Sequence, residues 1–348
     1  MVMKKRLLVT AAAVCGIATM SGCSLLPTKS STDIDPPKTV VYKSDQPSKE
    51  VQAKKEETVK RELYLIDRNG YVVPQTFQLP KSTSLAKQAL EYLVKDGPVT
   101  DELPNGFQAV LPPNTEVLGV QTQKDGTIIA DFSPEFKQYR AEDELKVFQA
   151  VTWTLTQFDN VTKVKIRVNG KELASMPVNK AQIGDGLTRD DGINFDKGDI
   201  VDIMNSRPVT LYYVSQGEMG DTYYVPVTTR ISNAETDSYS AIVNELVKGP
   251  SEYSNLVSDF GTDTKLVSQP VFKGGKLVLN FNDGIYGNIA KNMINNDVLQ
   301  PLVLSLTEQK GVKSIEIQIN GKLTALDQQG KPLSQPVSRP KDVNTKKL

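Results

Sequence analysis

Two stretches of this chain, residues 61–175 and 208–326, are copies of one sequence module. Because surface loops tolerate insertions, small drifts in the spacing of matched segments are expected. The repeated residues are mainly apolar or turn-forming, and they include no shared set of reactive side chains. The duplication therefore predicts two like domains, and it favours a protein that presents surfaces over one that does chemistry. The clearest matches are Leu93-Val94-Lys95-Asp96-Gly97-Pro98 with Leu246-Val247-Lys248-Gly249-Pro250, and Val168-Asn169-Gly170-Lys171 with Ile319-Asn320-Gly321-Lys322.

The first 22 residues have the pattern of a lipoprotein signal peptide. Three basic residues, Lys4 to Arg6, precede an uncharged apolar run at 7–19. That run is too short to cross a bilayer of roughly 30 Å as a helix. Ser21-Gly22 places two small residues before Cys23, which predicts cleavage and attachment of a lipid (palmitate) to Cys23. A plain signal peptide and an N-terminal anchor helix are the alternatives, and Cys15 is a weaker lipidation candidate because it lies inside the apolar run.

Composition divides the rest of the chain into folded and unfolded parts. Residues 23–60 are polar and rich in Pro and charge, which predicts a disordered tether. By flexible-chain scaling it spans roughly 30–35 Å. A first domain at 61–180 and a second at 208–328 are each long enough for a core. A Gly- and Asp-rich linker at 181–207 joins them, and a polar tail follows at 329–348.

Each module reads as strand, strand, helix, strand, strand, helix, strand. Asn69-Gly70 between two extended runs is a strong hairpin signal. A second hairpin is expected at 115–132, with its counterpart in strands 264–272 and 276–281. The first helix carries apolar residues on one face up to Val94, and the second spans 142–158. We predict an α+β fold, with two helices packed on one face of an antiparallel-rich sheet of three to five strands. The inward residues expected in the second helix are Leu145, Phe148, Val151, Thr152 and Leu155.

The composition excludes several classes of site. The chain has no histidine and only two cysteines, of which Cys15 leaves with the signal. The commonest general base and metal ligands are therefore missing, and no metal or cofactor is expected. Removal of the signal leaves 38 basic and 41 acidic residues, a net charge of −3. Nothing in that balance suggests nucleic-acid binding.

Two alternatives to a structural role remain open at this point. A wall-active glycan hydrolase would use paired carboxylates, for which the candidates are Asp131, Asp159, Asp190 and Asp191. Strand-end or turn roles fit these acids better, since Asp131 becomes Asn280 in the other copy. The Asp clusters of 184–199 also lack the spacing of a calcium loop. A glycan-binding surface lipoprotein would use a tyrosine platform, although sheet packing is the commoner role of such residues: Tyr64, Tyr71, Tyr212, Tyr213, Tyr223 and Tyr224.

The repeated motifs resemble the GerM family of sporulation and germination lipoproteins, which carry two tandem GerMN domains. The likeness covers residues 61–326 and the lipoprotein start. It implies modules similar to ring-building motifs, and a lipid-anchored protein in the space between the membranes around the forespore. It also implies protein partners in the channel that links mother cell and forespore, with homo- or hetero-oligomers left open. The family has no catalytic residues, so the resemblance implies no enzymatic activity.

Overall fold

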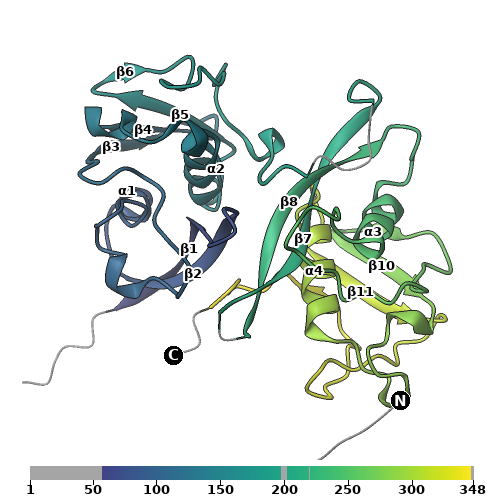
Figure 1. The fold of residues 1–348 in the computed structure, drawn as a ribbon. Coiled ribbons are helices and arrows are strands. Elements are labelled where there is room, and N and C mark those ends of the chain that lie inside the picture. The colour runs from purple at the N-terminus through teal and green to yellow at the C-terminus, as the bar shows by residue number, and fades with distance from the viewer. Residues whose placement is uncertain (1–56, 197–201, 219, 346–348) are drawn as a thin grey trace, which may run out of the picture. The chain divides into compact units, whose positions relative to one another are not determined.

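The computed structural model describes residues 57–196, 202–218 and 220–345 (Figure 1). The predicted signal peptide, Cys23 and nearly all of the predicted tether lie outside these ranges. Within them, no helix is both long enough and apolar enough to span a membrane.

The first module consists of a hairpin, two α-helices and a sheet (Figure 1). Strands β4 and β5 pair in parallel, whereas β3 and β6 flank them antiparallel, in the order β3-β4-β5-β6. The hairpin β1–β2 forms a sheet of its own. In chain order the elements are β1 Thr58–Ile66, β2 Val72–Pro80, α1 Leu85–Glu91, β3 Val117–Thr122, β4 Thr127–Phe132, α2 Glu144–Leu155, β5 Lys163–Val168 and β6 Lys171–Glu172, with short 3-10 turns at Thr100–Glu102, Pro134–Lys137, Ala141–Asp143 and Arg189–Asp191.

The second module repeats this order and again separates the hairpin from the sheet. Its sheet runs β12-β11-β10-β9, with β10 and β11 parallel. The elements are β7 Ser206–Gln216, β8 Thr222–Ser232, α3 Ser238–Lys248, β9 Val271–Lys273, β10 Lys276–Phe281, α4 Asn296–Thr307, β11 Ser314–Ile319 and β12 Val337–Ser338, with 3-10 turns at Asp283–Ile285 and Ile289–Lys291.

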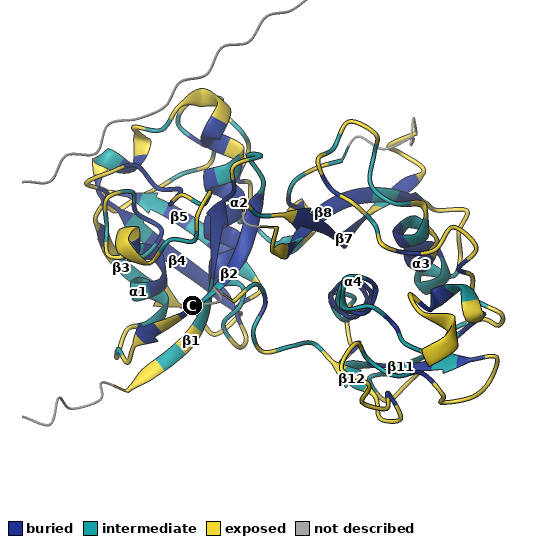
Figure 2. Ribbon diagram, turned by 60° about the horizontal axis from the view of Figure 1, so that its bottom comes forward, coloured by how far each residue is buried: buried dark blue, intermediate teal, exposed yellow. Residues whose placement is uncertain are grey.

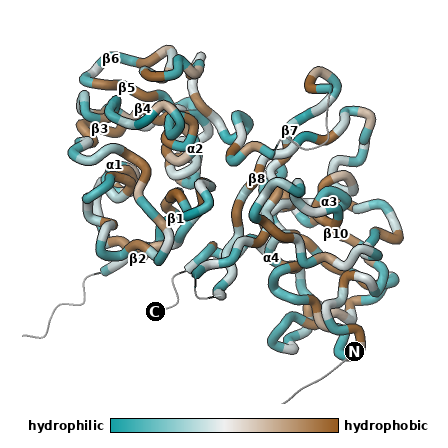
Figure 3. Tube along the Cα trace, in the orientation of Figure 1, coloured by the Kyte–Doolittle hydropathy of each residue, from teal (hydrophilic) through white to brown (hydrophobic). Residues whose placement is uncertain are grey.

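In each module the second helix is buried between the hairpin and the sheet. Helix α2 contacts β1 and β5, and α4 contacts β7 and β11. Figure 2 shows α4 viewed along its axis, with the β7–β8 hairpin on one side and β11 on the other. Strands β5, β10 and β11 alternate half-buried and buried residues. Figure 3 shows hydrophobic stretches in brown along β5 and β10. Each sheet therefore packs one face on a helix and leaves the other toward solvent.

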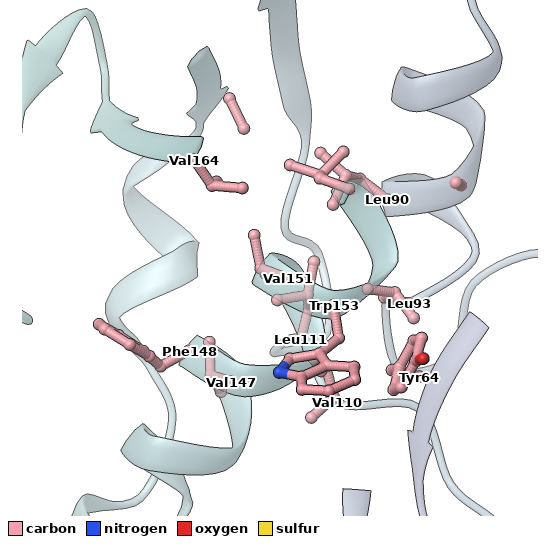
Figure 4. Packing of buried hydrophobic residues seen from close by; sticks show 14 of the residues in the cluster. Tyr64, Leu90, Leu93, Val110, Leu111, Val147, Phe148, Val151, Trp153 and Val164 are labelled. Carbon is pink, nitrogen blue, oxygen red and sulfur yellow. The ribbon is translucent and has the colours of Figure 1, made fainter. Parts of the chain in front are cut away.

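Aromatic side chains join the hairpin to α2 in the first core. Trp153 of α2 and Tyr64 of β1 are both fully buried, with ring centroids 5.6 Å apart (Figure 4). Leu90 of α1 is also fully buried among these residues. Each such side chain stabilises the fold by about 1.5–3 kcal/mol through burial.

The structure confirms the α+β class and the paired modules, and it corrects three local predictions. Leu145 is 46% exposed rather than inward, because the buried position in the first turn of α2 is taken by Glu144, whose carboxylate accepts from the Val178 and Asn179 N–H groups. Strand β9 covers only Val271–Lys273, since Pro270 cannot donate to a ladder. The first helix ends at Glu91, and Val94 instead forms a bridge with Leu111.

Candidate functional site: the junction between the modules

Two short segments that follow the modules share one sequence pattern. Residues 189–194 read Arg-Asp-Asp-Gly-Ile-Asn, and residues 339–344 read Arg-Pro-Lys-Asp-Val-Asn. In both, an arginine stands five residues before an asparagine that follows a β-branched apolar residue. That apolar residue is buried in each case, as Ile193 and Val343. The module repeat therefore extends into the segments predicted as linker and tail.

Asn194 binds the edge strands of both modules. Its Oδ1 accepts a hydrogen bond from the Val72 N–H of β2 at 2.8 Å. Its Nδ2 donates to the Val72 carbonyl at 2.7 Å and to the Pro226 carbonyl of β8 at 2.8 Å. One side-chain amide thus holds a strand of each module.

Asn344 makes the reciprocal set of contacts. Its Oδ1 accepts from the Tyr224 N–H of β8 at 2.8 Å. Its Nδ2 donates to the Tyr224 carbonyl and to the Pro74 carbonyl of β2, both at 2.8 Å. Tyr224 and Pro226 are the sequence counterparts of Val72 and Pro74. Asn194 therefore makes two bonds to the first module and one to the second, whereas Asn344 makes two bonds to the second module and one to the first. We refer to Asn194 and Asn344 as the asparagine clamps.

The asparagine clamps supply hydrogen-bond donors to backbone carbonyls of β2 and β8. Pro74 and Pro226 have no N–H, so β2 and β8 cannot extend a sheet across these positions. Their carbonyls still need donors when water is excluded. The asparagine amides supply those donors. Threonines two residues further along the strands add further bonds. Thr228 Oγ1 accepts from Ile193 N at 2.9 Å, and Thr76 Oγ1 accepts from Val343 N at 3.0 Å.

Both asparagines adopt a left-handed backbone conformation, with φ of 45° at Asn194 and 54° at Asn344. Asparagine tolerates this region better than other residues with a Cβ atom. The same residue type therefore serves the backbone turn and the side-chain bonds.

Apolar and aromatic contacts support the clamps. Val73 of β2 is fully buried and belongs to the hydrophobic cluster of the second module. The rings of Phe107 and Tyr223 pack edge to face, with centroids 5.2 Å apart. The Tyr223 hydroxyl donates to Asp67 Oδ2 at 2.8 Å. Burial raises the pKa of Asp67, while this hydrogen bond acts in the opposite direction.

A charged cluster lies beside the clamps. Glu308, at the end of α4, accepts from Arg189 Nη1 at 2.6 Å and from Arg339 Nη1 at 3.1 Å. The guanidinium of Arg189 stacks over Trp153, 4.4 Å from the ring centroid. Burial alone would raise the pKa of Glu308, but the two guanidinium groups and their hydrogen bonds hold it below its ordinary value. Each module thus contributes one of these two arginines to a single shared carboxylate.

Glu62 of β1 is the second acid of this region. Burial raises its pKa, and the positive charges of Arg339 and Arg189 only partly offset that effect. In the second module the matching strand residue is Thr210, whereas the helix-end residue matching Glu308 is Gln157 in the first. Each module therefore contributes one acid and one arginine to this region. The acid of the first module is on the first strand of its hairpin, and that of the second is at the end of its second helix.

The acids nominated as catalytic candidates have structural roles or lie exposed. Asp131 accepts from the Gly170 N–H, with its two carboxylate oxygens at 3.0 and 3.1 Å, and Asn280 accepts the equivalent bond from Gly321 at 2.8 Å. Asp191 caps its own turn through the Thr188 N–H at 2.7 Å. Asp159 and Asp190 are exposed, and Asp190 adjoins Asp191 in one short turn that Asp191 caps. No group of metal-ligating residues occurs among the described residues.

The tyrosines of the hairpins do not form an exposed platform. Four of the six are buried, with 5% exposure or less, and the other two are half-buried. Tyr224 instead donates its hydroxyl to Asp297 Oδ1 at 3.2 Å. The glycan-platform interpretation loses its main residues, which are Tyr64, Tyr212, Tyr213 and Tyr223.

Sequence reasoning missed the clamps, although a signal was present. The match of Arg189 and Ile193-Asn194 with Arg339 and Val343-Asn344 continues the internal repeat at a constant spacing. It was hidden because the surrounding residues are polar and turn-rich, which is also the composition of a linker. An asparagine after a β-branched residue, at matching positions behind both modules, is the sequence signal for the clamps.

The junction joins two like modules into one unit, and known proteins share this tandem arrangement. A family model described as "Germane: Sporulation and spore germination" matches residues 62–174 and 210–324. The chain belongs to this family. It is 49% identical to the spore germination protein GerM of Bacillus subtilis (strain 168) over 346 residues, covering 94% of each chain.

Solved structures extend the likeness. The tandem GerMN domains of the sporulation protein GerM from Bacillus subtilis superpose with a TM-score of 0.78 and 55% identity, covering 83% of this chain and 99% of that one. The first GerMN domain of the same protein covers 38% of this chain and 98% of its own, with 65% identity and a TM-score of 0.37. The family model, the relative in Bacillus subtilis and the tandem-domain structure support a role related to sporulation, and none of their descriptions names an enzyme.

Proposed function

We propose that this chain is a lipid-anchored assembly protein of sporulating cells, which acts by contact and not by turnover. It would lie on the outer face of the cell membrane, in the space around the forespore, and support the complex that links mother cell and forespore. The observation that carries the proposal is the junction. The two copies share no set of reactive side chains. Instead, reciprocal hydrogen bonds hold the two like modules together.

A rigid pair suits a scaffold because partner surfaces on the two modules then keep a fixed relation. Preorganisation of this kind lowers the ordering cost of binding. The nominated acids offer no catalytic pair, since Asp131 and Asp191 are engaged in turns and strand ends. The partner is expected to be a protein of the same envelope complex.

Charge exchange on an exposed helix tests action by contact. Lys87 and Glu91 of α1 pair at 3.8 Å, with 39% and 44% of their side chains exposed. The double variant Lys87→Glu/Glu91→Lys keeps that pair and inverts the surface charges. We expect circular dichroism to be unchanged while localisation of the fluorescently tagged channel proteins is lost.

Parallel variants on β5 extend the test to a second face. Lys165 pairs with Glu172 at 2.9 Å, and Lys165→Glu/Glu172→Lys is the matched exchange. Loss of sporulation from Asp131→Asn, with fold and partner localisation intact, would overturn the scaffold proposal in favour of a hydrolase.

Lipid anchoring has its own test. Cys23→Ala should leave the chain unprocessed or release it from the membrane fraction. Wild-type processing and detergent partitioning in that variant would contradict anchoring at Cys23 without bearing on the junction.

A further inference from the structure

We propose that a basic cavity beside the junction binds a phosphate group, carried either by a phospholipid headgroup or by a soluble or polymeric phosphate. The cavity has a volume of about 440 Å³. Its charged lining consists of Lys60, Arg61, Glu62, Arg189, Arg339 and Lys341. These residues come from β1 and from the two segments that carry the clamps.

The cavity has an excess of positive charge after its ion pairs are counted. Glu308 is shared by Arg189 and Arg339, and Asp342 pairs with Lys60. Glu62 is the third acid. Five basic residues therefore face three acids, which leaves a local charge of +2 and no internal partner for two cations.

Arg61 and Lys341 are those two cations. Arg61 Nε is buried and has no hydrogen-bond partner in the described part of the chain. Its guanidinium is held in place by the Lys60 carbonyl, 2.8 Å from Nη1, and lies 5.4 Å from the centroid of the Phe158 ring. Lys341 is exposed and makes no hydrogen bond or ion pair with any residue that the structure describes. A buried donor without an acceptor is unfavourable, so an oxygen-rich anion is favoured there.

The chemistry fits phosphate better than a lone carboxylate. A phosphate presents acceptor oxygens in several directions, and guanidinium groups bind them in pairs. Cations from three separate segments can approach such a group together. The volume is also larger than one small ion needs, which suits a phosphate on an organic or polymeric carrier.

Glu62 gives the proposal a directional test. Its carboxylate lines the cavity and repels an anion, so Glu62→Gln should tighten phosphate binding. Lys341→Gln removes an attractive charge and should weaken binding about fivefold, as expected for one Lys near an anionic group. Lys124→Gln, an exposed lysine in the β3–β4 turn, is the matched control and should have no effect.

The experiment uses the chain without residues 1–23, which keeps every described residue and lacks the predicted lipid. Binding of glycerol 3-phosphate is measured by calorimetry, and co-sedimentation is measured with phosphatidylcholine vesicles that contain or lack phosphatidylglycerol. Calorimetric binding alone identifies a soluble phosphate, and vesicle binding that requires phosphatidylglycerol identifies a headgroup. Absence of both, or binding that ignores Lys341→Gln and Glu62→Gln, overturns the proposal. Unchanged Trp153 fluorescence verifies that each variant is folded.

Discussion

Replacing Asn194 with alanine is the sharpest test of the junction. The change removes the hydrogen bonds to Val72 N–H, Val72 carbonyl and Pro226 carbonyl, all at 2.7–2.8 Å. At about 1 kcal/mol for each, that loss amounts to roughly 3 kcal/mol. Alanine also fits poorly at a φ of 45°, at a cost of about 1 kcal/mol. We expect the free energy of unfolding to fall by about 4 kcal/mol.

The assay can follow the junction directly. Trp153 is the single tryptophan, and its Nε1 donates to the Gly192 carbonyl, two residues before Asn194. Its fluorescence during urea unfolding therefore reports on the clamp segment, while circular dichroism reports on the whole fold. In the variant we expect both transitions to move to lower urea.

Two further variants separate the contributions. Asn114 has a φ of 61° and is exposed without a side-chain hydrogen bond, so Asn114→Ala measures the backbone cost alone, about 1 kcal/mol. Asn194→Gly removes the three bonds and relieves the backbone. A loss for Asn194→Ala no larger than that for Asn114→Ala would show that the three side-chain hydrogen bonds do not stabilise the fold.

The remaining predictions concern single buried groups. Leu90→Ala should cost roughly 2–5 kcal/mol in denaturant unfolding, because Leu90 is fully buried; a loss below about 0.5 kcal/mol would contradict its place in the core. Glu308→Gln should cost about 2 kcal/mol at pH 7, less than a fully buried pair because both arginines are about a quarter exposed, and the cost should shrink as pH falls and wild-type Glu308 is protonated. Glu62→Gln should do the reverse. A raised folded-state pKa means that wild type loses stability as pH rises above the unfolded value of about 4.3, so the variant gains at pH 7 and matches wild type at pH 3; no gain at pH 7 would show that burial does not dominate. Asp131→Asn should leave unfolding unchanged within about 0.5 kcal/mol, since Asn280 already makes the same contact in the second module, and a larger loss would show that the charge matters.

Local periodicity was sufficient to predict the fold class, and it failed where tertiary contacts set the pattern. Turn signals such as Asn69-Gly70 predict the hairpins correctly, because the conformation of a tight turn is set by the few residues within it. The inward face of α2 was harder to predict, because a helix covered on two sides is buried almost all round and its stripe is not distinct. Leu145 was misplaced for that reason.

The junction could not be derived from periodicity at all. Asn194 and Asn344 act on strands more than 30 residues away in sequence, and their side chains look like ordinary turn residues. Glu308 likewise looks like the end of a helix until the two arginines are seen around it. Only the internal repeat, extended past the modules, could have drawn attention to these positions.

The reciprocal clamps also constrain higher assembly. Contacts that exchange their roles between two modules are isologous, and an isologous contact closes on itself instead of adding further copies. The outer edges of β2 and β8 are used within one chain and are not available for growth. If many chains line up in a ring or a filament, they must use a heterologous contact elsewhere, and the edge strands of the two four-stranded sheets, β3 and β6 in one and β9 and β12 in the other, each have an unpaired side. The repeating unit of such an array would be the two-module pair and not the single module.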